Sequence, residues 1–79
     1  MQVEFYGILE EVVGQPRMTL ELAEGATVAD ALEALAGQQP ELAPHLARVA
    51  YAVGDELVGK DTRLKADDTL VLLPPVSGG

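Results

Sequence analysis

The C-terminal residues are the ones whose types and order suggest chemistry. The sequence has 79 residues and ends in Pro74, Pro75, Val76, Ser77, Gly78 and Gly79. Paired prolines fix φ and favour an extended stem, and residues without a Cβ fit into a channel too narrow for any other side chain. We expect the chain to end at Gly79 with a free α-carboxylate, which is a poor electrophile at neutral pH. Reaction at this group therefore requires activation, for example as an acyl-adenylate, by groups that another protein supplies.

The rest of the sequence offers no catalytic constellation. It contains no Cys, which excludes disulfides, thiolate metal sites and thiol nucleophiles. We interpret its single histidine, His45, as a surface or structural residue. The acidic residues of the predicted turns lack the spacing of a calcium loop, so they predict a solvated surface and no metal site; they are Asp55, Glu56, Asp61, Asp67 and Asp68. We therefore expect neither catalysis by the chain alone nor a bound cofactor.

Composition and charge limit the partners. The 13 acidic and 5 basic residues give a formal net charge of −8, which argues against nucleic acid and anionic membranes and favours basic protein surfaces. The 48% of hydrophobic residues is ordinary for a globular domain. No segment approaches the roughly 20 apolar residues that cross a bilayer. The first residues do not resemble a signal peptide, so we expect a cytoplasmic protein.

Periodicity predicts the elements that must position the C-terminal residues. Alternating apolar residues predict strands over 2–6, 18–22, 49–53 and 70–73, with a short edge strand within 56–64. Thr27 as N-cap with Asp30 three residues later predicts a capped helix, which we expect to end at Gly37 in a left-handed C-cap. Shorter helical turns are predicted at 7–13 and 40–46.

This order predicts an α+β domain over residues 1–73, with an extended tail over 74–79. One main helix covers one face of the mixed sheet and leaves the other face open. In the last strand we expect Leu70 and Leu72 to face the helix, and Val71 and Leu73 to face outward. If Tyr6 lies beside them, the outward face is an apolar patch of the kind that marks a partner site. The alternative is that the loop over residues 56–65 covers this patch.

Several segments together resemble the ubiquitin-like sulfur carriers, and within them most closely the small subunits of molybdopterin synthases. The resemblance covers nearly the whole chain. Its segments are VEFYG (3–7), LEEVVG (9–14), TVADAL (27–32), YAVG (51–54), DDTL (67–70) and PPVSGG (74–79). The resemblance implies a β-grasp fold in which the last strand lies beside the first, at the centre of the sheet.

The resemblance also implies a reaction at Gly79. A ubiquitin-activator-like enzyme uses ATP to adenylate this carboxylate, and sulfur from a donor protein then replaces the adenylate to leave a thiocarboxylate. The tail inserts into the large subunit of molybdopterin synthase, in a heterotetramer. There it gives sulfur to the cyclic pyranopterin monophosphate, and this forms the molybdopterin dithiolene. The expected partner-binding surface comprises Tyr6, Leu57, Val71 and Leu73; family members often have Phe where this chain has Tyr6 and Leu73.

Other functions fit the same residues. A ubiquitin-like modifier, or a sulfur carrier for thiazole synthesis or tRNA thiolation, uses the same activated Gly79. A non-covalent interaction domain needs no reaction at the tail. The Pro-Pro-Val-Ser-Gly-Gly ending favours the molybdopterin branch.

Overall fold

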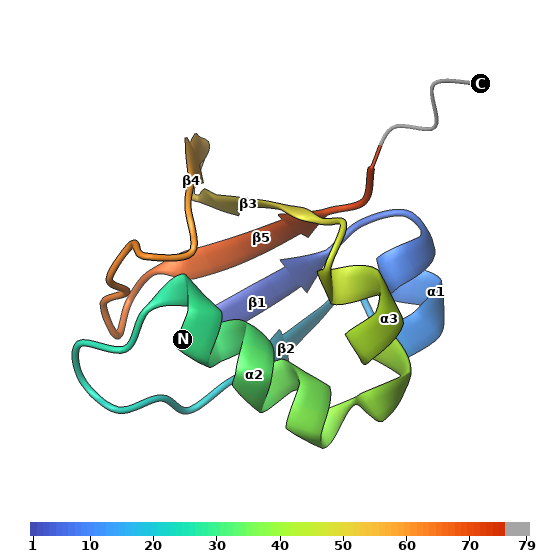
Figure 1. The fold of residues 1–79 in the computed structure, drawn as a ribbon, viewed down its shortest axis with the longest axis horizontal. Helices are drawn as coiled ribbons and strands as arrows, with labels where there is room; N and C mark the ends of the chain where they lie inside the picture. Colours follow the sequence, from blue (N-terminus) through green and yellow to red (C-terminus); the bar gives the residue numbers. More distant parts are fainter. Residues whose placement is uncertain (76–79) are drawn as a thin grey trace.

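A five-stranded mixed sheet is the frame of the molecule (Figure 1). The structure is a computed structural model and describes residues 1–75. The strands are β1 (Gln2–Phe5), β2 (Arg17–Thr19), β3 (Ala50–Val53), β4 (Glu56–Val58) and β5 (Thr69–Leu73). Their order across the sheet is β2-β1-β5-β3-β4; β1 and β5 run parallel, and the other neighbouring pairs are antiparallel. The last strand therefore lies at the centre beside the first, as predicted.

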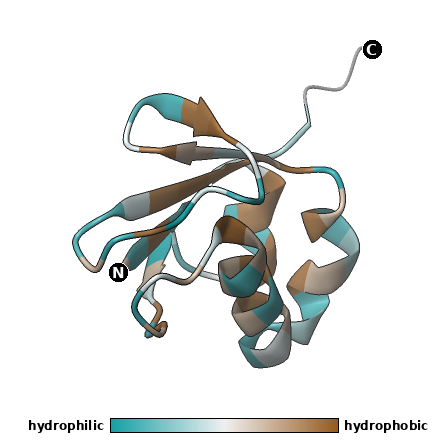
Figure 2. Ribbon diagram, turned by 60° about the vertical axis from the view of Figure 1, so that its left-hand side comes forward, coloured by the Kyte–Doolittle hydropathy of each residue, from teal (hydrophilic) through white to brown (hydrophobic). Residues whose placement is uncertain are grey.

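The helices pack against one face of this sheet (Figures 1 and 2). They are α1 (Ile8–Val13), α2 (Val28–Gln38), the short 3₁₀ helix η1 (Pro40–Leu42) and α3 (Ala43–Leu46). The predicted capping box of α2 is present: the Asp30 amide donates to Thr27 Oγ1 at 3.3 Å, and the Thr27 amide donates to Asp30 Oδ2 at 2.9 Å. No helix among residues 1–75 is both long enough and apolar enough to cross a membrane.

Strand periodicity decides which side chains form the core. Val3 and Phe5 of β1, with Leu70 and Leu72 of β5, are at most 2% exposed and pack under the helices. From the helix side come buried residues of α1, α2, η1 and α3; they are Leu9, Val28, Ala31, Leu32, Leu35, Leu42 and Leu46. No polar or charged residue among residues 1–75 is buried. The fold therefore rests on apolar burial between one sheet face and its helices.

Two boundaries differ from the predictions by more than one residue. Helix α2 continues through Gly37 to Gln38, and Gly37 does not adopt the left-handed conformation. The C-cap is Gln39, whose amide donates to the Leu35 carbonyl at 2.7 Å. Pro40 then begins η1, because proline fits the first position of a new helix and cannot continue the old hydrogen-bond ladder. Strand β2 is also shorter than the predicted 18–22, because only residues 17–19 pair with β1.

Candidate functional site

The face of the sheet away from the helices carries the four side chains predicted to bind partners. In β5, Val71 and Leu73 alternate with the buried residues and so point to this side. Residues directly opposite each other on paired strands point to the same face of the sheet. Glu4 and Ala52 lie opposite Val71, and Ala50 lies opposite Leu73. Leu57 of β4 lies opposite Ala52 and therefore points to the same face. Tyr6 joins them, because its hydroxyl donates to Glu4 Oε1 at 3.2 Å. We call this surface the open face; it comprises Glu4, Tyr6, Ala50, Ala52, Leu57, Val71 and Leu73.

Large apolar side chains of the open face remain accessible. Leu57 is 69% exposed and Tyr6 is 49% exposed, whereas Val71 and Leu73 are half-buried between their neighbours. The order of the strands explains the difference. Leu57 lies on the edge strand β4, while Val71 and Leu73 lie on the central strand with a neighbour on each side. Exposed apolar groups of this size on one face of a small domain are typical of a surface that another protein covers.

The loop between β4 and β5 does not cover the open face. It runs to the start of α2, on the other side of the sheet, where Val28 N donates to Thr62 O at 2.9 Å. Leu64 N donates to Ala26 O at 2.8 Å, and Leu64 is buried in the core. The alternative in which this loop shields the apolar patch is therefore wrong.

The C-terminal stem leaves the sheet at the end of β5. Strand β5 ends at Leu73, and the half-buried Pro74 follows directly. Beside the stem lies a hollow of about 350 Å³ between the start of α1 and helix α3; its walls are Ile8, Leu9, Pro44, His45, Arg48, Pro74 and Pro75. The stem is therefore seated between two helices at its root. The predicted tail residues Val76, Ser77, Gly78 and Gly79 lie outside the described residues.

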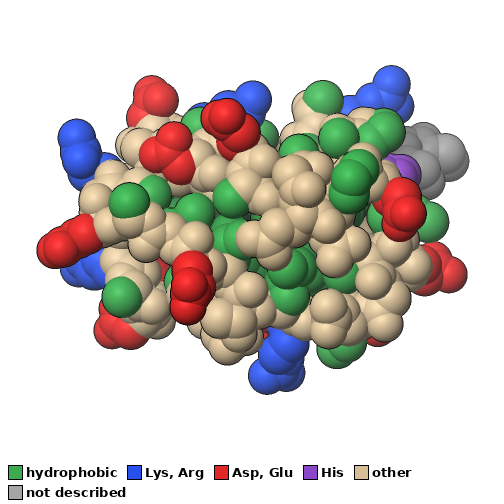
Figure 3. All heavy atoms as spheres, turned by 90° about the horizontal axis from the view of Figure 1, so that it is seen from below, with side chains coloured by type: hydrophobic (Ala, Val, Ile, Leu, Met, Phe, Trp, Pro, Cys, Tyr) green, Lys and Arg blue, Asp and Glu red, His purple; other side chains and the backbone are tan. Residues whose placement is uncertain are grey.

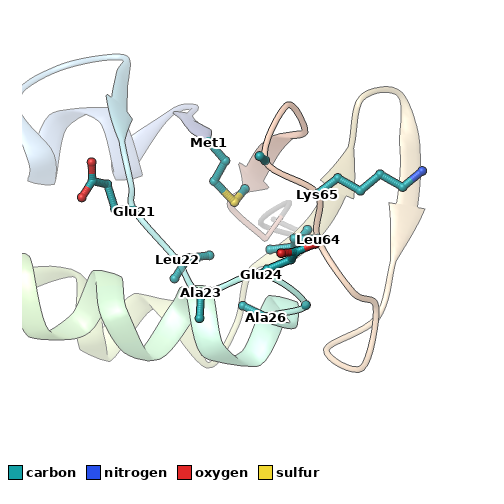
Figure 4. A pocket seen from close by; sticks show the side chains of 10 residues that line it. Met1, Glu21, Leu22, Ala23, Glu24, Ala26, Leu64 and Lys65 are labelled. Atoms are coloured by element: carbon teal, nitrogen blue, oxygen red, sulfur yellow. The ribbon is translucent and has the colours of Figure 1, made fainter.

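A larger hollow of about 700 Å³ lies at the end of β1 away from the stem (Figure 4). It is formed by Met1, residues 21–26 and residues 64–66. Its lining is mostly aliphatic, with Glu21, Glu24 and Lys65 at the rim. None of the residues predicted for the functional site contributes to it.

The charged groups form no catalytic or metal-binding cluster in the described part of the chain. Within residues 1–75 no group of three His, Cys, Asp or Glu side chains is placed to hold a metal ion. Acidic side chains are spread over the helix side of the molecule (Figure 3). Asp68 has a local structural role, because its Oδ2 accepts the Lys65 amide at 2.8 Å and closes the turn before β5. Apart from these local contacts, the main surface features of the described residues are the open face and the stem.

Known proteins are similar to this chain over nearly its whole length. The sequence model described as the ThiS family matches residues 3–79. The chain belongs to the ThiS family.

Similar proteins span the same length as this ThiS-family chain. The molybdopterin synthase sulfur carrier subunit of Chlamydomonas reinhardtii is 30% identical, over 100% of this chain and 98% of that protein. The crystal structure of SAMP1 from Haloferax volcanii is 30% identical, with a TM-score of 0.89 over 99% of this chain and 97% of the other. One chain in the complex of subunits 1 and 2 of molybdopterin-converting factor from Helicobacter pylori is 28% identical, with a TM-score of 0.69 over 99% of this chain and 96% of the other. The predicted ubiquitin-like β-grasp fold is thereby confirmed.

Sequence reasoning missed the residues that seat the stem of this ThiS-family chain. Gly7, Ile8 and Arg48 lie around Pro74, although no motif or periodicity connects them to it. Ile8, the first residue of α1, is 46% exposed. The available signal was the parallel pairing of the first and last strands, because it brings the residues that follow both strands together.

Proposed function

We propose that the chain is a sulfur carrier that serves as the small subunit of a molybdopterin synthase. The observation that carries the proposal is the course of strand β5 through the molecule. Val71 and Leu73 contribute to the open face, and the chain passes directly from the end of this strand into Pro74 and Pro75. A partner that covers the open face is therefore in place to receive the tail. Membership of the ThiS family and similarity to molybdopterin synthase sulfur carrier subunits support this proposal.

The proposed chemistry takes place at the α-carboxylate of Gly79, taken as the C-terminus. A carboxylate oxygen attacks the α-phosphorus of ATP in an activating enzyme, which yields the acyl-adenylate and pyrophosphate. Hydrosulfide released by a donor protein then attacks the acyl carbon; the C–S bond forms as the C–O bond to the phosphate breaks, and AMP leaves with that oxygen. The product is a thiocarboxylate, whose sulfur is a better nucleophile than a carboxylate oxygen. It displaces an oxygen substituent from a side-chain carbon of the cyclic pyranopterin monophosphate and forms a thioester, whose hydrolysis leaves the sulfur on the pterin and restores the carboxylate. Two such transfers supply the two sulfurs of the dithiolene.

The proposed partner of the open face is the large subunit of the synthase. The Helicobacter structure is a complex of two subunits of molybdopterin-converting factor, and one of its chains is similar to this chain over almost its whole length. The open face offers that partner the apolar side chains of Tyr6, Leu57, Val71 and Leu73. Burying such groups provides affinity, while the acidic surface raises the rate of association with a basic partner.

Intact-mass spectrometry tests the proposal directly. The chain is incubated with its cognate activating enzyme, ATP and a sulfur donor, and we expect a mass gain equal to the exchange of one oxygen for sulfur at Gly79. Deletion of Gly79 is the first control and must abolish the gain. Omission of ATP is the second. An unchanged mass in the complete reaction contradicts the proposal.

A second candidate function is conjugation to other proteins through Gly79. The observation in its favour is the similarity to SAMP1, named a small archaeal modifier protein, from Haloferax volcanii. In this case the activated carboxyl is attacked by a lysine amine of a target instead of sulfur. We expect a ladder of high-mass species on a denaturing gel of cell extract that disappears when Gly79 is deleted. A ladder that persists without Gly79, or no ladder at all, removes this candidate.

A further inference from the structure

The stem begins with a close approach between Pro74 and Gly7. A Cβ built at Gly7 would lie 3.0 Å from Cγ of Pro74 and 4.0 Å from its Cδ. The shorter distance is tighter than ordinary van der Waals contact, so a side chain at position 7 would force the ring of Pro74 to shift by a few tenths of an ångström. Gly7 and Pro74 are 67 positions apart in the sequence, and the sheet brings them together.

The register of the central strands explains why these two residues meet. Strands β1 and β5 are parallel, and Phe5 lies opposite Leu72. Two residues further along each chain stand Gly7 and Pro74. The chain after β1 must turn away into α1, while the chain after β5 must continue outward. The two paths therefore separate at this point.

The turn at Gly7 makes this separation possible. Leu9 N donates to Tyr6 O at 3.1 Å and closes a four-residue turn. Gly7 has φ of 57° and ψ of −131°, which are the values of the first central residue of a type II′ turn. Glycine is preferred at this position because an L side chain is strained there. Helix α1 begins at the next residue, Ile8.

We propose that Gly7 is a positioning residue for the C-terminal stem. Because it has no side chain, the ring of Pro74 lies directly on the turn, with Ile8 and Pro44 among the other walls of the hollow. The fixed φ of both Pro74 and Pro75 then carries this orientation forward. Gly7 thus sets the direction in which the chain leaves the sheet toward a partner. The inference rests on the proposed function, since this direction matters when the tail enters another protein.

A purely structural role for Gly7 makes a different prediction. If glycine is needed only for the turn, its replacement strains the backbone equally whatever residue stands at position 74. If the contact with the stem matters, the effect of replacement depends on the proline ring. Pro74→Ala removes the Cγ and Cδ atoms that a Cβ at position 7 would meet. A double-mutant cycle of Gly7→Ala and Pro74→Ala therefore cancels the strain of the turn and isolates the contact.

The experiment measures sulfur transfer by the four proteins of this cycle. Each carrier is prepared as thiocarboxylate and titrated against its cognate large subunit, at a temperature where circular dichroism shows every variant folded. In the Pro74 background we expect Gly7→Ala to raise KM roughly tenfold with kcat changed by less than about twofold, because insertion and not chemistry is impaired. In the Pro74→Ala background we expect Gly7→Ala to raise KM by less than about twofold. An equal rise of KM in both backgrounds, or no rise in the first, overturns the proposal.

Gly14→Ala is the matched control. Gly14 also has a positive φ, of 88°, and terminates the same helix, but nothing lies within 4 Å of a Cβ built there. We expect this variant to lose stability without a rise of KM. A rise like that of Gly7→Ala would show that strain in α1 alone accounts for the effect, and would overturn the proposal.

Nuclear Overhauser effects separate this inference from the proposed function. In the free chain we expect cross-peaks between the Gly7 α-protons and the ring protons of Pro74, and their loss in Gly7→Ala. This measurement needs no partner and no sulfur. If the unmodified chain transfers no sulfur, the proposed function fails, and the cross-peaks alone then decide the positioning role. Their absence in the unmodified chain overturns it.

Discussion

Truncation of Leu57 tests whether the open face is a binding surface. Leu57→Ala removes three carbon atoms from a side chain that is 69% exposed in the free protein. Burial of each carbon contributes about 0.8 kcal/mol, so a partner that covers the exposed portion loses about 1.7 kcal/mol of binding free energy. This is an increase of about 15-fold in Kd. The free protein already buries the remaining, smaller part of the Leu57 side chain. We therefore expect Leu57→Ala to lower the free energy of unfolding by only about 0.7 kcal/mol.

Isothermal titration calorimetry with the cognate large subunit measures this Kd, and urea denaturation measures the stability. Val58→Ala is the control on the same strand, because Val58 is half-buried and packs against the core on the opposite face. We expect Val58→Ala to lower the free energy of unfolding while Kd changes by less than about twofold. A Kd for Leu57→Ala within about twofold of the unmodified chain would refute the assignment of the open face as the binding surface.

Three further predictions concern the tail, the core and the main helix. Deletion of Gly79 should abolish the exchange of oxygen for sulfur seen by mass spectrometry but leave Tm unchanged, because the core is complete when β5 ends at Leu73; a large fall in Tm would contradict this. Leu72→Ala should lower the free energy of unfolding, measured in urea, by about 2–5 kcal/mol, since Leu72 is fully buried. Val71→Ala on the open face should lower it by about 1 kcal/mol or less. Equal losses for the two variants would mean that the core extends to both faces of the sheet. Thr27→Ala should cost about 1 kcal/mol, because its Oγ1 caps α2, and thermal denaturation that shows no loss would count against this role.

Local signals in the sequence were sufficient for most elements. The capping box of Thr27 and Asp30 lies within four residues and marks the start of α2 correctly. Strand periodicity separates Leu70 and Leu72 from Val71 and Leu73. All four are apolar, so periodicity does not decide which pair is buried; the prediction that Leu70 and Leu72 face the helices is confirmed. Gly37 was misleading: a glycine near the end of a helix favours a C-cap, but Pro40 determined where α2 stops.

Contacts between distant segments were beyond local reasoning. The course of the loop after β4 depends on two backbone hydrogen bonds, from Val28 to Thr62 and from Leu64 to Ala26. They join positions 34 and 38 residues apart, which no periodic pattern links. The contact between the ring of Pro74 and Gly7 likewise depends on the parallel register of the first and last strands. The family resemblance predicted that the first and last strands are neighbours. The close approach of Gly7 and Pro74 depends in addition on the path of the backbone beyond the ends of both strands.

The central position of β5 has a mechanical consequence for anything that grips the C-terminus. β5 is held by β1 along one edge and by β3 along the other, and both ladders run nearly its full length. A pull along the strand axis therefore loads many backbone hydrogen bonds in shear at once, instead of peeling them one at a time from an edge. An enzyme that draws the tail into its active site pulls on the most firmly anchored strand of the sheet, so the tail can bear tension while the domain stays folded.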